Sequence, residues 1–167
     1  MLITTSRRPG HRARILGREL ARVIPNAKYV PRGVETVDKL ALMAESLGHT
    51  WVMVINSSVG HPKELRFLNI GKGWRWFDKR VELGEVKIQR DLGQRVSFEG
   101  MKIYAEGKPA QEFAEFLGEI SGLPISEKLS EAGVVLSIIT NSGLKIHFQK
   151  RPTSKIMGPV LQVIRFG

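Results

Sequence analysis

The arginines near the start of the chain have a spacing that could do chemistry. Arg14, Arg18 and Arg22 recur at every fourth position, which places their side chains on one face if the segment is a helix. No carboxylate stands between them on that face, so in the free protein they repel one another instead of pairing. The planar guanidinium binds phosphate oxygens in pairs. The row therefore favours a phosphate-rich ligand; the alternative is an ordinary solvated helix face.

Positive charge is concentrated around this row. Residues 1–33 hold eight Lys/Arg and a single acid, Glu19, and so carry +7 of the formal net charge of +10. Residues 101–133 hold three bases and six acids, a balance of −3. This segregation, with a pI near 10.2, points to nucleic acid as the first candidate partner; a generally basic protein is the alternative. The candidate RNA contacts are Arg7, Arg8, Arg12, Arg14, Arg18, Arg22, Lys28 and Arg32.

A second group of residues mixes aromatic and basic side chains. If Trp74 and Trp76 share an exposed strand face, they could stack on unpaired bases while neighbouring cations hold phosphates. More often, two tryptophans with this spacing are core residues beneath a helix. The candidates for this role are Trp74, Arg75, Trp76, Lys79 and Arg80.

The sequence offers no recognisable catalytic group. It has no cysteine, which removes disulfides, cysteine–zinc sites and thiol catalysis, and no two of its four histidines stand at a metal-ligand spacing. Gly71-Lys72-Gly73 lacks the glycine spacing of a phosphate-binding loop and indicates a hairpin turn. No apolar run is long enough to span a membrane. We therefore expect a soluble, cytoplasmic, non-enzymatic protein with no metal or cofactor, monomeric when free.

Strands and helices alternate in the part of the chain that must position the arginines. Apolar residues lie on the face opposite the arginine row, Ala13, Leu16 and Leu20 among them, and predict an amphipathic helix. Thr36 is placed to cap the next helix. The predicted order is strand 2–6, helix 11–24, strand 26–30, helix 37–47 and strand 51–55, which implies a layered α/β fold.

The chain between residues 57 and 104 is expected to add antiparallel strands. A loop is predicted at 57–63, and short strands at 64–70, 74–77, 81–88 and 95–104. Consecutive short strands of this kind favour antiparallel pairing. The sheet is therefore expected to be mixed, with helices packed against it.

Residues 101–124 repeat the pattern of residues 1–25 at an offset of one hundred positions. Each segment indicates a strand, a turn that contains Pro9 or Pro109, and one amphipathic helix. We infer an internal duplication in which two structurally similar halves, 1–90 and 91–167, share a single domain of residues 1–167. The second half lacks a counterpart of the helix predicted at 37–47.

The two helices of this repeat differ in charge. The helix predicted at 11–24 carries four arginines and one acid, whereas the helix predicted at 109–122 carries three acids and no base. Duplicated helices whose charges diverge in this way are expected to have different functions. The second helix is expected to be an outer face or a site for a basic protein partner, through Glu112, Glu115 and Glu119.

Ile3-Thr4-Thr5-Ser6-Arg7-Arg8-Pro9, then a basic helix, then Pro31-Arg32-Gly33 follow one another in an order that resembles the opening of the Brix-domain family. The family commonly has Gly-Pro-Thr followed by Phe where this chain has Gly73-Trp74-Arg75-Trp76-Phe77, so no role is carried over to that turn. The resemblance covers essentially the whole chain, and residues 1–33 are its most specific part. The matching stretches are Ile3-Thr4-Thr5-Ser6-Arg7-Arg8-Pro9 before a basic helix, Ile24-Pro25-Asn26-Ala27, Pro31-Arg32-Gly33, and Gly60-His61-Pro62 with Leu65.

The resemblance implies two similar α/β halves, each like the anticodon-binding domain of class II aminoacyl-tRNA synthetases. It also implies a stand-alone, archaeal-type ribosome-biogenesis factor, similar to the small-subunit processing branch, that binds precursor ribosomal RNA and works with other ribosome-assembly proteins. The first hypothesis is thus a non-catalytic RNA-binding factor that assists rRNA processing and subunit assembly. The second is a protein-interaction scaffold in a preribosomal complex, using the groove between the halves or the acidic second helix.

Overall fold

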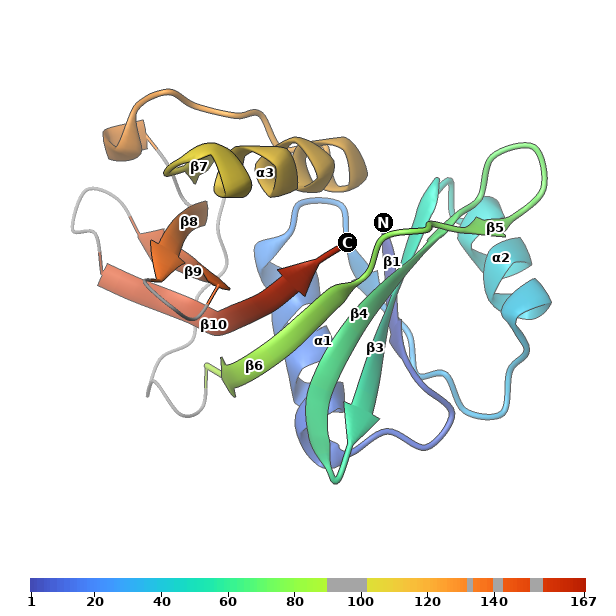
Figure 1. The fold of residues 1–167 in the computed structure, drawn as a ribbon. Coiled ribbons are helices and arrows are strands. Elements are labelled where there is room, and N and C mark those ends of the chain that lie inside the picture. Colours follow the sequence, from blue (N-terminus) through green and yellow to red (C-terminus); the bar gives the residue numbers. More distant parts are fainter. Residues whose placement is uncertain (90–101, 132–133, 140–142, 151–154) are drawn as a thin grey trace.

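The computed structural model describes residues 1–89, 102–131, 134–139, 143–150 and 155–167. Its strands form one mixed sheet with helices on both faces (Figure 1). The first part of the chain forms β1 (Leu2–Thr5), α1 (His11–Val23), β2 (Lys28–Tyr29), α2 (Val37–Ser46), β3 (Trp51–Ser58), β4 (His61–Asn69), β5 (Arg75–Trp76) and β6 (Val81–Lys87). The second part forms β7 (Ile103–Ala105), α3 (Lys108–Ser121), the short 3-10 helix η1 (Leu129–Glu131), β8 (Val134–Ile139), β9 (Gly143–Lys150) and β10 (Lys155–Phe166).

The strands lie in the order β2-β1-β3-β4-β6-β10-β9-β8-β7, with β5 paired to β4. β1 is parallel to β2 and β3, and β7 is parallel to β8. The remaining pairs, including the β6–β10 pair at the middle of the sheet, are antiparallel. The mixed α/β sheet predicted from the sequence is confirmed.

The second half of the sheet repeats the first in reverse order around the β6–β10 pair. Ile3 of β1 pairs in parallel with Tyr29, and Ile103 of β7 pairs in parallel with Ile125. In each half the next strand forms an antiparallel pair with the strand that follows it in the chain: β3 with β4, and β8 with β9. The halves are therefore alike in topology, as predicted, while the duplication that would explain the likeness stays a prediction.

The helices are divided between the two faces of the sheet. On one face α1 and α3 share a single hydrophobic cluster that contains Leu16 and Phe116. On the other face α2 packs Ala41 and Ala44 against Leu2 and its neighbours on β3 and β4. The Thr36 hydroxyl accepts a hydrogen bond from the Lys39 amide at 3.3 Å and so forms the predicted cap. In the second half the described segment between α3 and β8 holds η1 where the first half has α2.

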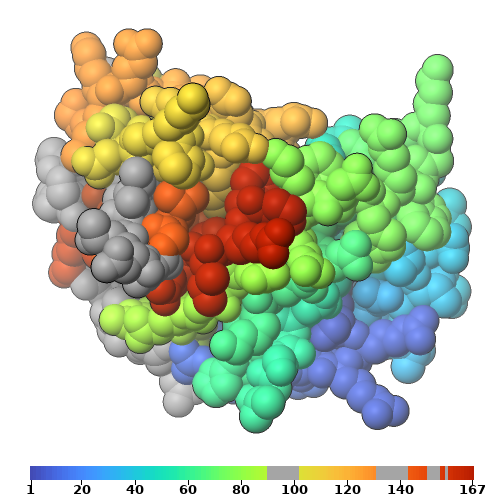
Figure 2. All heavy atoms as spheres, in the orientation of Figure 1, coloured from blue at the N-terminus to red at the C-terminus, as the bar shows by residue number. Residues whose placement is uncertain are grey.

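Phe116 of α3 joins the two halves within this core. Its ring centroid lies 4.6 Å from that of Phe77, 4.9 Å from Phe67 and 6.0 Å from Trp51, all in the first half. Figure 2 shows yellow-to-red atoms of the second half packed directly against green atoms of the first. The space left between α1 and α3 is an apolar cavity of about 40 Å³, about enough for one water molecule.

Residues 57–63 form a tight hairpin, so the predicted loop is wrong. β3 continues to Ser58 and β4 begins at His61, which leaves Val59 and Gly60 as the turn. Both have positive φ angles, 49° and 79°, as in turns whose twist matches that of paired strands. A β-branched residue rarely adopts this conformation, and for that reason a hairpin could not be predicted here from residue types.

Two further predicted elements differ from the structure or fall outside it. β5 spans two residues, Arg75–Trp76, and is shorter than the strand predicted at 74–77. Of the strand predicted at 95–104, residues 95–101 lie outside the described part of the chain. The predicted boundary between the halves, at residues 90 and 91, also lies outside the described residues.

Candidate nucleic-acid interface

The arginine row lies on the outer side of α1. Arg14, Arg18 and Arg22 are exposed, whereas Leu16 and Leu20 on the opposite side of the helix are at most 2% exposed. This burial fixes the rotation of α1, because the apolar side must face the sheet. The three guanidinium groups are therefore presented together to solvent.

No described carboxylate neutralises the row. Glu19, the acid on α1, is 5% exposed, and its Oε2 accepts a hydrogen bond from the Gln89 amide at 2.6 Å. The ion pairs of the described residues join other groups: Lys39–Glu35, Lys79–Glu112, Arg80–Glu64, Arg80–Glu82 and Lys87–Glu85. Within the described part of the chain, the positive charge of the row is therefore not balanced by these ion pairs.

Two further cations extend this surface at the start of the helix, because Arg7 and Arg8, in the turn before α1, are also exposed. The Arg18 guanidinium lies 5.6 Å from the centroid of the Tyr29 ring. Lys28, also exposed, precedes Tyr29 on β2, but it pairs with Leu2, whose side chain packs beneath α2, so Lys28 lies on the opposite face of the sheet from α1. We call Arg14, Arg18 and Arg22 the α1 basic face.

Two more of the eight predicted RNA contacts are placed away from this face. Arg12 is half-buried, and its Nη2 donates a hydrogen bond to the Val86 carbonyl at 2.9 Å. Arg32 is 7% exposed, and its Nε donates to the Glu35 carbonyl at 2.8 Å. Burial, followed by the nearby positive charge of Arg7, lowers the pKa of Arg32 from its ordinary value. Neither arginine belongs to the α1 basic face.

The aromatic and basic residues at 74–80 do not form a shared exposed platform. Trp74 is 39% exposed, and its Nε1 donates to Asp38 Oδ1 at 2.9 Å. Trp76 is half-buried against the cluster beneath α2, with the Arg66 guanidinium 4.6 Å from its ring centroid. Arg75 is exposed, while the two remaining cations, Lys79 and Arg80, are paired with carboxylates of this chain.

The three acids predicted as a partner face on α3 separate in the structure. Glu112 forms an ion pair with Lys79 of the first half, so it links the halves. Glu115 lines a pocket of about 470 Å³ between β7 and α3. Glu119 is exposed outside that pocket.

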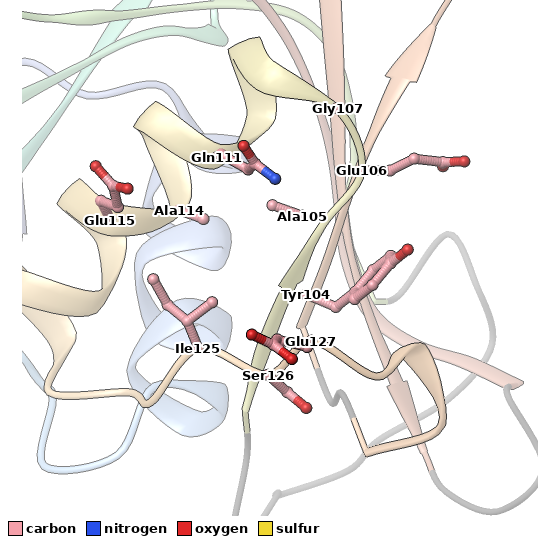
Figure 3. A pocket seen from close by; sticks show the side chains of 10 residues that line it. All are labelled: Tyr104, Ala105, Glu106, Gly107, Gln111, Ala114, Glu115, Ile125, Ser126 and Glu127. Carbon is pink, nitrogen blue, oxygen red and sulfur yellow. The ribbon is translucent and has the colours of Figure 1, made fainter.

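This pocket brings together acids that the sequence keeps apart. Glu106 follows β7 and Glu127 follows the Ile125 bridge, so no local pattern predicts that they line the same pocket as Glu115. In Figure 3, Gln111 points into the space between α3 and β7, whereas Glu106 points away from α3. The lining residues are Tyr104, Ala105, Glu106, Gly107, Gln111, Ala114, Glu115, Ile125, Ser126 and Glu127.

A glycine on each helix fixes how α1 and α3 correspond. A Cβ atom on Gly17 would lie 2.6 Å from the Tyr29 ring, and one on Gly118 would lie 3.2 Å from the Leu123 carbonyl oxygen and 3.8 Å from Ile125. Tyr29 and Ile125 are the equivalent partners of Ile3 and Ile103. The two glycines are 101 positions apart, one more than the offset read from the sequence.

At this offset the exposed charges of the two helices are opposite. Arg14 corresponds to Glu115 and Arg18 to Glu119, and all four side chains are exposed. The buried Ala13 corresponds to Ala114, which is also fully buried. The same helical position therefore carries a cation in the first half and a carboxylate in the second.

The described residues show no further chemical centre. None of their helices is long and apolar enough to cross a membrane. No three acidic or histidine side chains among them come together as a metal site. The interface is therefore characterised by its surface charge and shape.

Comparison with known proteins identifies the family. A probable Brix domain-containing ribosomal biogenesis protein from Pyrococcus abyssi is 30% identical over 190 aligned positions, which cover 98% of this chain and 82% of that protein. The protein of the same description from Pyrococcus horikoshii is 36% identical over 110 residues, 65% of this chain. That match spans 47% of the relative, or about half of its length. No family model matches the chain.

Solved structures show the same fold. The crystal structure of a probable ribosomal biogenesis protein from Aeropyrum pernix superposes with a TM-score of 0.83 at 23% identity, covering 98% of this chain and 94% of that one. An archaeal Imp4-like protein superposes with a TM-score of 0.74 at 20% identity, covering 100% and 99%. With the sequence match to the Pyrococcus abyssi protein, the chain belongs to the family of Brix domain-containing ribosomal biogenesis proteins.

Proposed function

We propose that this chain is a non-catalytic factor of ribosome biogenesis that binds precursor ribosomal RNA along the α1 basic face. It assists rRNA processing and subunit assembly together with other assembly proteins, as a free monomer in the archaeal cytoplasm. On its motifs we assign it to the small-subunit processing branch. The observation that carries the proposal is the exposed and uncompensated row of Arg14, Arg18 and Arg22.

The electrostatics of α1 explain why RNA is the favoured ligand. Successive arginines of the row are about 6 Å apart along the helix axis, at a rise of 1.5 Å per residue. Their mutual repulsion costs free energy in the unbound protein, and a phosphate backbone laid along the helix removes it while releasing counterions. Binding should therefore weaken steeply as the salt concentration rises.

The test is binding of a precursor rRNA fragment across a salt series by the R14E/R18E/R22E variant. We expect a large loss of affinity, and a decrease of about 2 in the slope of log affinity against log salt, from about 0.7 per lost phosphate contact on single-stranded RNA. The control is K108E/K128E/K155E, which changes the net charge equally at three exposed lysines of the second half. Unchanged affinity and slope in the α1 variant, or equal losses in both variants, would contradict the proposal.

A protein-interaction scaffold is the second candidate, and the acid-lined pocket beside α3 is the observation that favours it. There a basic segment of an assembly protein would be held by Glu115 and Glu127, with Glu106 at the outer side of the pocket. Capture of partners from cells before and after nuclease treatment separates the two functions. Partners that are lost with the RNA support RNA binding. Partners that remain after nuclease and are lost in E106Q/E115Q/E127Q support the scaffold.

A further inference from the structure

Two arginines outside the α1 basic face, Arg7 and Arg32, follow the neighbouring ends of β1 and β2. The two strands run in parallel and stay joined to their last residues, since the Val30 amide donates to the Ile3 carbonyl at 2.9 Å and Thr4 Oγ1 donates to the Val30 carbonyl at 2.8 Å. Arg7 follows Thr4 by three residues, and Arg32 follows Val30 by two. The carboxyl edge of parallel strands, where these arginines lie, is the usual ligand position in α/β sheets.

Arg32 is held in a fixed position. It is 7% exposed, and its Nε donates to the Glu35 carbonyl at 2.8 Å. The Glu35 amide donates back to the Arg32 carbonyl at 3.1 Å, across a turn in which Gly33 has φ of 55°. Among the described residues, this bond to Glu35 is the single hydrogen bond of the guanidinium, so its two terminal nitrogens are left for another acceptor.

The charge of this pair of arginines is not balanced within the described chain. Arg7 is exposed and forms no ion pair with a described residue. The Glu35 carboxylate lies 3.1 Å from Lys39 Nζ as an ion pair, although its Oε2 accepts no hydrogen bond from a described residue. The positive charge of Arg7 is close enough to contribute, after burial, to the lowered pKa of Arg32. Two neighbouring cations, one of them buried, destabilise the protein until an anion lies between them.

We propose that Arg7 and Arg32 bind one phosphate group at this edge. The planar forks of two arginines suit the tetrahedral oxygens of phosphate, and the fixed Arg32 lowers the entropy cost of binding. In the setting of the proposed function, on which this inference rests, the group is an RNA phosphate, either a terminal monoester or an internal diester. The site differs from the α1 basic face because it holds a single phosphate at a defined position.

The first test is thermal unfolding in inorganic phosphate and in chloride at equal ionic strength. Phosphate should raise the melting temperature of the natural protein, while R7A should lose most of that increase. In chloride alone R7A should melt no lower than the natural protein, since removing Arg7 relieves repulsion at Arg32. R165A, which removes an exposed arginine of the second half, should keep the full phosphate effect. An R7A variant with the full effect, or a natural protein with none, would overturn the proposal.

The second test separates the two sources of phosphate with one oligoribonucleotide, synthesised with a 5′-phosphate or a 5′-hydroxyl. A terminal site predicts that the natural protein prefers the 5′-phosphate and that R7A loses the preference. An internal site predicts that R7A weakens both RNAs by roughly tenfold, the effect of losing a charge-assisted hydrogen bond. If R7A binds both RNAs as R165A does while R14E/R18E/R22E fails, the phosphate site is wrong and the proposed function stands. If every variant binds alike, both are wrong.

Discussion

The first and second halves of the molecule place equivalent helices on the same face of one sheet and give them opposite charges. Gly17 and Gly118 mark the same point of each helix, close to Tyr29 and Ile125. On the exposed side of the helices, Arg14 and Arg18 of α1 correspond to Glu115 and Glu119 of α3. Exposed positions are free to differ in charge because they do not pack against the sheet. The shared topology therefore indicates a shared fold, and the charges indicate separate functions.

The largest predicted effect concerns the core that the halves share. Phe116 is 6% exposed and touches three aromatic rings of the first half, so F116A should lower the free energy of unfolding by about 3–5 kcal/mol. Chemical denaturation should still show a single transition. The half-buried Leu117 provides the control, and L117A should cost less. Two separate transitions would show that the halves unfold independently, and would contradict the single core that the comparison of the halves assumes.

The paired glycines give a smaller and unequal effect. In G17A the new Cβ would lie 2.6 Å from the Tyr29 ring, and this overpacking should cost about 1–3 kcal/mol. In G118A the nearest contact is 3.2 Å, and the helix gains up to about 1 kcal/mol from replacing glycine, so the net change should be small. Thermal unfolding of both variants measures the difference. Equal losses of stability would mean that the two helices approach the neighbouring segments of the same chain equally closely.

The ion pair between the halves should have the smallest effect. Lys79 and Glu112 are 42% and 64% exposed, and solvent screens such pairs, so E112Q should change the free energy of unfolding by less than about 1 kcal/mol. E119Q, at an exposed acid on the same helix, serves as the control. A loss in E112Q that approaches that of F116A would mean that charge, and not the aromatic core, holds α3 to the first half.

The helices could be predicted from the sequence because their apolar spacing is regular. Residues 11–24, 37–47 and 109–122 became α1, α2 and α3 within two residues at each end. The rotation of α1, and with it the exposure of the arginine row, followed from the burial of its apolar side. The topology of the sheet was reached in outline, as two similar halves with mixed pairing.

The features that the sequence could not give depend on contacts between distant residues. Nothing local marks Glu106 and Glu127 as neighbours of Glu115, or Glu112 as the partner of Lys79. Arg32 was counted as a surface cation, although tertiary packing buries it.

The burial of Trp76 agrees with the alternative that the spacing of the tryptophans favoured, a core residue beneath a helix, whereas the turn at Val59 and Gly60 was beyond the sequence. Trp76 is covered because β5 pairs with β4 on the side of the sheet that α2 packs against. The hairpin turn places a valine at positive φ, which propensity alone argues against.

Crosslinking of bound precursor rRNA, followed by mass spectrometry of the modified peptides, tests the central claim most directly. The account predicts that RNA adducts fall on residues 7–32, around the α1 basic face and the Arg7–Arg32 edge. It predicts none at the corresponding positions of the second half, from Tyr104 to Glu127. Adducts concentrated on α3 and the acid-lined pocket, with none on α1, would contradict it.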